Sequence, residues 1–361
     1  QQRFVYNLSS LAHGNIQILK NEECIQSIVD FLLLQDEKKR DEKVQLLAIF
    51  GDAAIAENID IRERALTVLS LAGESFLQYG DKDLIVAAVN SFRKWLENEK
   101  ELLPGLVVVI KRMAELGRWL LENSFWQEAE ETVSLFYRIH EGSCVKSPAM
   151  RSLVSKTLGV FATKRILHDI TQGFLLEDHK QTLCRNILIY FQTNAIEYLL
   201  QWVITSEDRK QRVALINLIP KFGDLAIPSL KECLGQQPSW AGARNVLYML
   251  GEIGNDSCYG IMKQFYRHED KRVQHEMICS VVKMGGDSMV DRLLEGLLWV
   301  DDDLKPYLLH LLIEHGRQDE KILSALCQLV EKSCNFSSNT EKRLIIAAVA
   351  ALRTFPCQRS I

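Results

Sequence analysis

The sequence predicts an all-α protein whose antiparallel helix pairs stack into a right-handed α-α superhelix. Apolar residues recur with the i, i+3, i+4, i+7 spacing of helices along nearly all of the 361 residues, and the alternation typical of strands is almost absent. Only 19 glycines and 7 prolines interrupt this pattern. A glycine also returns every 31 residues, at 223, 254, 285 and 316, which indicates a helical repeat.

The apolar spacing divides the first 205 residues into successive helices. The expected helices are 22–35, 43–57, 60–78, 82–98, 102–123, 125–140, 148–160, 163–175, 178–192 and 195–205, and shorter pairs follow to the C-terminus. Two of these helices carry a capping-box pattern at their start. Asp60 with Glu63, and Ser124 with Gln127, are placed so that each side chain satisfies a free backbone amide of the first turn.

Two prolines have positional meaning. Pro148 follows Ser147 and occupies a first helical position, where the missing N–H costs nothing. Pro220 lies three residues before Gly223, late in a predicted helix, so we expect it to bend that helix.

The recurring glycine marks the end of the first helix, helix A, of each 31-residue repeat. Aliphatic residues stand four positions before the glycines, at Ile219, Leu250, Val281 and Leu312. We expect each glycine to adopt the left-handed conformation that ends a helix, where a side chain would clash. A second helix, helix B, then follows with an apolar stripe of its own. The four stripes are Ile227, Leu230 and Leu234; Tyr259, Met262 and Tyr266; Val290, Leu293 and Leu297; and Ile322, Leu326 and Leu329. Because one pair is too small to bury its stripe, neighbouring pairs must stack.

Three segments of this repeat resemble a known family. YMLGEIGNDSCYGIM (248–262) looks like the HEAT-like repeat of the phycobilisome-lyase type, in which a helix end of the form ALGEIG precedes a short polar turn. KFGDLAIPSL (221–230) and KMGGDSMVDRLL (283–294) are similar. The resemblance implies a HEAT-type solenoid. We therefore expect one continuous array, with divergent, irregular helical repeats over 1–207, four regular HEAT-like repeats over 208–334, and the start of a further, truncated repeat over 335–361.

Charge and composition argue against several classes of protein. The formal net charge of −4, from 43 basic and 47 acidic residues, gives no global attraction to nucleic acid. No stretch reaches the roughly 18 apolar residues of a membrane span. Nine cysteines without a CxxC pair fit free thiols in a reducing compartment, so we expect a cytoplasmic protein. Because the chain begins at Gln1 and not at Met, we expect it to be part of a longer protein.

The candidate chemical groups have simple structural interpretations, and we expect no enzyme, cofactor or metal site. His268 and His275 are separated by a predicted loop, so their spacing is not that of metal ligands. Cys258 and Cys327 lie on helices expected to stack inside the array, where a thiol is inert. The sequence contains no HExxH, P-loop, GxGxxG or GxSxG motif.

Charged residues at the start of helix A invite a pairing hypothesis. Asp208 with Arg212, and Asp303 with Lys305, could each join a carboxylate before the helix to a basic residue just inside it. The equivalent residues of the other two repeats are Ala243 and Gln274, which interrupts any continuous ladder of ion pairs.

A solenoid without a catalytic constellation favours an interaction scaffold or regulatory docking module that uses its concave groove to bind another protein. Residues of helix B that lie off the apolar stripe should line this groove. They are Lys231, Glu232, Lys263, Gln264, Arg292 and Glu295. Their mixed charges favour a polar protein face recognised through specific pairs. Trp126 and Trp240, near turns between helices, are either exposed anchors for a partner or packed at the rim of the core.

Two alternatives from other classes of function stay open. The first is a bilin lyase or isomerase, implied by the resemblance, whose groove would hold a tetrapyrrole among convergent Arg, Tyr and Asp or His side chains. The second is a HEAT-like nucleic-acid-binding module, which would need a basic groove lined with aromatic residues.

Overall fold

A computed structural model describes residues 10–11, 15–102, 105–236, 238–316, 319–331 and 339–353, with the backbone alone for 339–341. Every regular element within these ranges is a helix, so the predicted all-α class is confirmed. The chain divides into two compact units, Gln1–Tyr198 and Leu199–Ile361. Helix α11 (Thr193–Thr205) spans the division.

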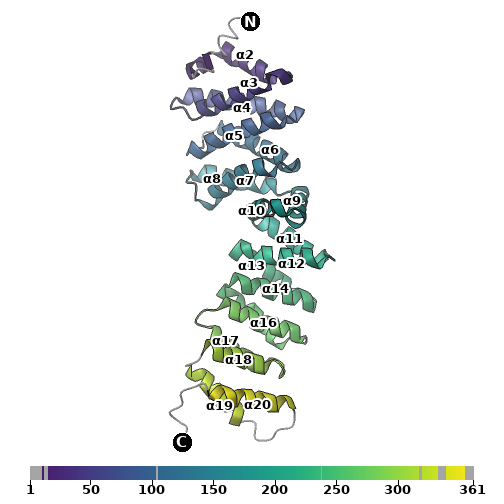
Figure 1. Cartoon of the computed structure of the whole chain (residues 1–361). Coiled ribbons are helices and arrows are strands. Elements are labelled where there is room, and N and C mark those ends of the chain that lie inside the picture. Colours follow the sequence, from purple (N-terminus) through teal and green to yellow (C-terminus); the bar gives the residue numbers. More distant parts are fainter. Residues whose placement is uncertain are drawn as a thin grey trace. The chain divides into compact units, whose positions relative to one another are not determined.

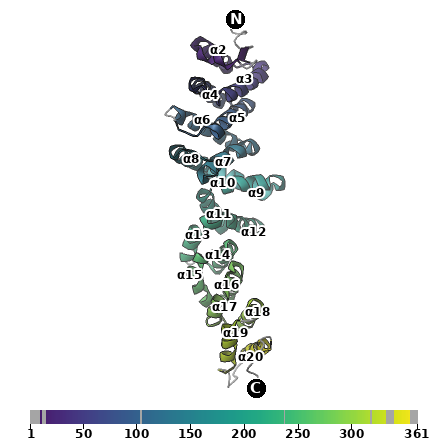
Figure 2. The same cartoon turned by 90° about the vertical axis from the view of Figure 1, so that its left-hand side faces the viewer.

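The first unit is a stack of helices arranged in two rows (Figure 1, Figure 2). One row is formed by α2 (Glu22–Leu33), α4 (Ile59–Tyr79), α6 (Leu106–Glu122) and α8 (Pro148–Phe161); the other is formed by α3 (Arg40–Ala53), α5 (Lys82–Asn98), α7 (Trp126–Glu141) and α10 (Gln181–Tyr190). Each helix contacts the next in its row, and α9 (Lys164–Leu176) packs mainly on α10. The predicted helix 82–98 is confirmed residue for residue, and most of the others end within three residues of their predicted bounds.

The second unit contains the predicted repeats. Helix A of the successive repeats is formed by α12 (Arg209–Leu218) with η4 (Ile219–Ala226), α14 (Trp240–Ile253), α16 (Lys271–Met284) and α18 (Lys305–His315). Helix B is formed by α13 (Ile227–Gly235), then by η5 (Asp256–Cys258), α15 (Tyr259–Met262) and η6 (Lys263–Arg267) together, and then by α17 (Met289–Leu297) and α19 (Glu320–Glu331). The final helix is α20 (Asn339–Leu352), within the segment predicted to begin another repeat. The helical-repeat architecture is thus confirmed.

The two capping boxes predicted at Asp60 and Ser124 do not form. Helix α4 is capped by Asn58, whose side chain accepts from the Ile61 amide, and not by Asp60. Ser124 has a φ of 62° and lies outside the cap of α7, which begins after Phe125 without a side-chain cap. Ser147 does cap α8 through the Met150 amide, and Pro148 is its first residue, as predicted.

The four repeat glycines differ in conformation. Gly254 is left-handed as predicted, with φ 73° and ψ 17°. Gly223 and Gly285 also have positive φ, but their ψ values of −140° and −143° lie in a region that only glycine adopts readily. Gly316 has φ −129°, so the prediction is wrong there. Its lack of a side chain has a packing reason, because a Cβ would lie 2.3 Å from Ile322 Cδ1.

In each unit one pair of helices packs closely through the same kind of contact, in which a serine of one helix faces a glycine of the other. Ser91 Oγ of α5 donates to Leu47 O of α3 at 2.7 Å, and Ser280 Oγ of α16 donates to Leu247 O of α14 at 2.9 Å. Four residues after each carbonyl stands a glycine that faces the serine. A Cβ at Gly51 would lie 3.1 Å from Ser91 Cα, and one at Gly251 would lie 2.8 Å from Ser280 Cα. Both pairs of helices therefore pack with their backbones almost in contact.

One continuous helical stretch, Arg209–Gly235, is long and apolar enough to cross a membrane by length and composition. The backbone at Gly223 is non-helical, so the stretch folds back as two helices. Leu215, Ile219 and Leu230 are completely buried in the fold. The stretch is therefore a pair of core helices. Pro220 lies at the start of the 3₁₀ segment η4, where the α-helix α12 ends.

Replacing Gly251 by alanine is expected to destabilise the protein by about 1–3 kcal/mol, because the new methyl group meets the Ser280 backbone. Gly260→Ala is the matched control, since a Cβ there meets nothing within 4 Å. Urea denaturation followed by circular dichroism measures both. Equal unfolding midpoints for the two variants would contradict the close packing of α14 on α16.

Candidate functional site

The six residues predicted to bind a partner lie on the helix-B elements of the second unit. Lys263 Nζ lies 3.5 Å from Glu295 Oε1, and the Tyr259 hydroxyl donates to Glu295 Oε2 at 2.7 Å. Lys231 Nζ donates to Ser257 O in the next repeat at 3.1 Å. Glu232 and Gln264 are exposed. We call this set, with Tyr259 added, the helix-B face; its charges join neighbouring repeats to one another.

Arg292 was predicted to point away from the core, and this is wrong. Its exposed fraction is 8%, and its guanidinium lies 4.8 Å from the centre of the Tyr259 ring while pairing with Asp256 at 2.9 Å. The cause is Gly296, one turn later on the same side of α17. A Cβ there would lie 2.7 Å from the Tyr266 ring, so the glycine lets the two helix-B elements approach until Arg292 is covered.

The two tyrosines at this contact stay protonated. Burial raises the pKa of Tyr259 and of Tyr266 well above the usual range, and the carboxylate of Glu295 acts in the same direction. Tyr266 donates its proton to Arg292 O at 3.0 Å. These phenols are hydrogen-bond donors that hold the repeats together, and they are poorly suited to act as bases at neutral pH.

A second surface lies where helix B ends and the next helix A begins. The indole of Trp240 lies under the Arg272 guanidinium at 3.4 Å, and that of Trp299 lies under Arg267 at 3.2 Å. The exposed fractions of Trp240 and Trp299 are 37% and 45%. We call the segments 204–212, 236–245, 267–272 and 298–305 the loop edge. Their exposed tryptophans are held in place by cations, which lowers the entropy cost of using them in binding.

Trp126, the other candidate anchor, is packed in the core. Its exposed fraction is 5%, and a Cβ at Gly173 would lie 2.5 Å from its ring. The packed interpretation therefore holds for Trp126, whereas Trp240 is exposed.

The predicted pairs at the start of helix A do not form. Arg212 donates to Ser206 O at 2.7 Å, and Asp208 instead accepts from the backbone amides of Lys210 and Gln211. Lys305 pairs with Asp302 and not with Asp303, which pairs with Lys271. Arg212 and Asp208 are thus engaged by nearby backbone groups, Asp303 by the neighbouring repeat, and Lys305 by a carboxylate of its own repeat.

Gln274 stands where two other repeats have a basic residue, and it bonds to backbone groups, not to a carboxylate. It stands at the position equivalent to Arg212, and both donate to the carbonyl six residues earlier: Gln274 Nε2 to His268 O at 2.6 Å. Its Oε1 also accepts from the Asp301 amide at 2.7 Å. The buried amide thus joins two successive loops of the loop edge.

The described residues contain no group of three or more His, Cys, Asp or Glu side chains that could hold a metal ion. His268 accepts from the Asp270 amide, and His275 stacks on Tyr307 with ring centroids 5.0 Å apart. Among the cysteines, Cys258 is buried as predicted, but Cys327 is exposed because it lies on the outer side of α19. Cys334 and Cys357 lie outside the described residues.

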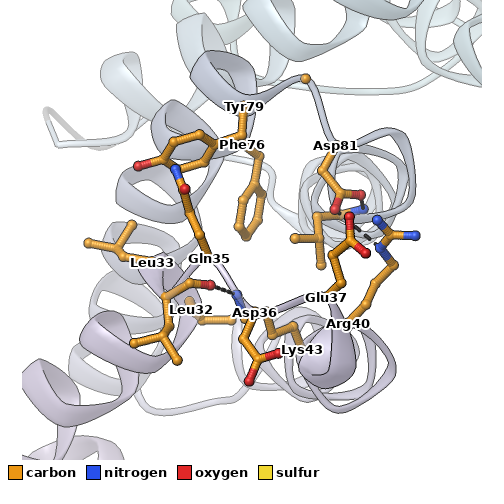
Figure 3. Close-up of a pocket in the computed structure, with 13 residues that line it drawn as sticks. Leu32, Leu33, Gln35, Asp36, Glu37, Arg40, Lys43, Phe76, Tyr79 and Asp81 are labelled. Atoms are coloured by element: carbon orange, nitrogen blue, oxygen red, sulfur yellow. Dashed lines mark hydrogen bonds and ion pairs between the residues drawn. The ribbon is translucent and has the colours of Figure 1, made fainter.

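The first unit has a pocket of about 470 Å³ between the ends of α2 and α4 and the starts of α3 and α5 (Figure 3). Apolar groups of Leu32, Leu33 and Phe76 form one side. On the opposite side the Arg40 guanidinium pairs with Asp81 at 3.2 Å. The Lys43 ammonium donates to Leu34 O, and burial lowers its pKa. The charges of Arg40, Asp81 and Lys43 are thus used within the fold.

The second unit has a pocket of about 440 Å³ at the loop edge. The end of α11, the start of α12, the end of α13 and the start of α14 surround it. Its lining is apolar or uncharged apart from one residue, Arg212. No feature of the sequence alone predicted this pocket, because its lining comes from four separate helix ends.

Comparison with known proteins shows a likeness of fold only. No family model matches the sequence, and no curated protein matches it. A chain of the full-length AP-3 complex in an intermediate open conformation is 12% identical, with a TM-score of 0.40, covering 98% of this chain and 71% of that one. A chain of the Kap95:Nup1 complex is 11% identical, with a TM-score of 0.33, covering 96% and 57%. The phycobilisome-lyase type of repeat is not confirmed by these comparisons.

The thiol of Cys184 is expected to resist alkylation. Burial raises its pKa to about 12, so that at pH 8 only about one molecule in ten thousand carries a thiolate. Iodoacetamide labelling followed by peptide mass spectrometry should modify the exposed Cys327 and leave Cys184 unmodified. Labelling of both at the same rate would show that α10 opens readily.

Arg292→Ala is expected to destabilise the protein by about 1–3 kcal/mol, because it removes a buried stem and leaves Tyr259 without its covering guanidinium. Lys263→Ala removes only an exposed pair, so its effect should stay within about 0.5 kcal/mol. Urea unfolding of the two variants compares them directly. A larger loss for Lys263→Ala would place the stabilising contact elsewhere on the helix-B face.

Proposed function

We propose that this chain is a cytoplasmic protein-protein interaction scaffold without catalysis of its own. Its helical repeats present similar surfaces, one after another, to partner proteins. The exposed tryptophans of the loop edge carry the proposal. Tryptophan and arginine are the residue types that dominate binding energy at protein interfaces, and here they occur as stacked pairs in two repeats. The helix-B face offers a second, polar surface with both signs of charge.

The chemistry of the described residues supports binding more than catalysis. Charged side chains of the helix-B face are engaged in hydrogen bonds and ion pairs within the fold. Cys279, beside His275 at 3.7 Å, has its pKa raised by burial. A thiol in such surroundings is a poor nucleophile. Cations of the helix-B face pair with carboxylates or carbonyls, which disfavours a basic groove for nucleic acid.

The bilin alternative has one observation in its favour. The pocket of the first unit brings Arg40, Tyr79 and Asp81 together, the residue types that a tetrapyrrole would require (Figure 3). Arg40 is already paired with Asp81 and lies 3.7 Å from Asp83, which leaves it little capacity to hold a propionate. This alternative is tested by mixing the chain with a free bilin and recording the absorbance spectrum. It requires the visible absorption band of the bilin to shift.

The scaffold proposal is tested by affinity capture from an extract of the source cells, with chemical crosslinking and quantitative mass spectrometry. Trp240→Ala with Trp299→Ala is expected to reduce capture of at least one partner by about tenfold or more. Lys231→Glu with Lys263→Glu tests the helix-B face in the same way. Val108→Ala removes an exposed apolar side chain of the first unit outside its pocket and serves as control.

Capture that falls with either pair of substitutions, while Val108→Ala captures as the parent does, supports the scaffold. The proposal is overturned if no protein is captured above the level of an unrelated bait, or if both pairs of substitutions leave every captured protein at the parental level.

A further inference from the structure

The pocket of the second unit is built like a receptor for an apolar side chain. Leu200, Val203 and Met249 form its apolar lining, and Ile204 stands at its rim with an exposed fraction of 68%. A volume of about 440 Å³ lies within the range of ligand pockets and is large enough for one or two bulky side chains. Trp240 begins the helix that supplies one wall, but its ring stacks on Arg272 and is not part of the lining.

The charges at this pocket are unbalanced in favour of cations. Arg212 is the only charged residue of the lining, and its Nη1 is used by Ser206 O. Arg209, Lys210 and Arg244 lie on the adjoining first turns of α12 and α14. Within the described residues, none of these four cations lies within 4.0 Å of a carboxylate oxygen.

Three carboxylates near the pocket offset part of this charge, so the four cations leave an excess of one positive charge. Asp208 is held by two backbone amides of α12, and Glu232 accepts from the Gln236 side chain at 3.4 Å. Glu207 is the third, and it is exposed. A partner that brings its own carboxylates to the rim would meet Arg209, Lys210 and Arg212, and none of these three forms an ion pair within the described residues.

We propose that this pocket binds an acidic peptide segment of a partner protein, with a large apolar side chain in the pocket and a carboxylate of the segment at Arg212. The guanidinium offers donors beyond the one used by Ser206 O, and planar paired donors suit a carboxylate. This inference rests on the proposed scaffold function and adds the chemistry of the partner.

The test is selection of a phage-displayed library of random dodecapeptides on the full chain, followed by fluorescence anisotropy of the selected sequences. Arg209→Glu with Lys210→Glu reverses the rim charge at the first two positions of α12, where carboxylates suit the helix start and should not impair folding. Lys221→Glu makes the same kind of charge change at the other end of this stretch, outside the pocket. Ile204→Ser tests the apolar rim, and Leu225→Ser, at an exposed leucine outside the pocket, is its control.

The selected peptides are expected to be acidic and to share a large apolar residue. Their affinity should fall about tenfold in the double charge reversal and about fivefold in Ile204→Ser, and stay within about twofold in the two controls. Peptides without an acidic bias, no selected peptide at all, or binding that the pocket variants leave unchanged would overturn the inference. If capture of cellular partners still falls with Trp299→Ala alone in that case, the scaffold function stands and only the partner chemistry assigned to this pocket is wrong.

Discussion

The approach of neighbouring helices at a glycine facing a serine is the contact on which the rest of the architecture depends. At Gly51–Ser91 and Gly251–Ser280 the backbones come so close that the serine hydroxyl reaches a main-chain carbonyl of the next helix. A larger residue on either side would push the helices apart. Such separation would also disturb the pairings between repeats, because Lys283 of α16 reaches Glu252 and the Tyr248 ring of α14 only at this spacing.

Side chains then join each repeat to the next at a separation of about one repeat length. Tyr248 donates to Asn217, Asn255 to Asp224, and Lys321 pairs with Asp291. These contacts make each repeat depend on its neighbour, as expected for repeat proteins in which every unit contacts only adjacent units. They also explain why several charges of the predicted binding surface are engaged within the chain.

Sequence patterning predicted the elements well because the apolar spacing that buries a helix also reveals it. The helix 82–98 and the glycine turn at 254 follow directly from local rules.

Prediction failed where contacts with other parts of the chain, or a competing residue nearby, decide the structure. Arg292 is buried because Gly296 admits Tyr266 from another helix, and Asn58 caps α4 although Asp60 fits the capping-box pattern. The pocket of the second unit was missed for the same reason, since four helix ends far apart in the sequence form it. The glycine-and-serine contact did leave a signal, because LLAIFGDA and LYMLGEI both place a glycine four residues after a leucine.

Gln274 illustrates how the type of side chain at one repeat position sets the response of the protein to its solution conditions. Where related positions carry Arg212 or Lys305, the loop is held by a charge. Gln274 joins the His268 carbonyl to the Asp301 amide with a neutral, buried carboxamide. Because mobile ions screen charges and leave buried neutral hydrogen bonds almost unaffected, this junction keeps its strength as ionic strength rises. The central repeats of the second unit therefore have a connection that salt does not weaken, whereas the exposed ion pairs around it do weaken in concentrated electrolyte.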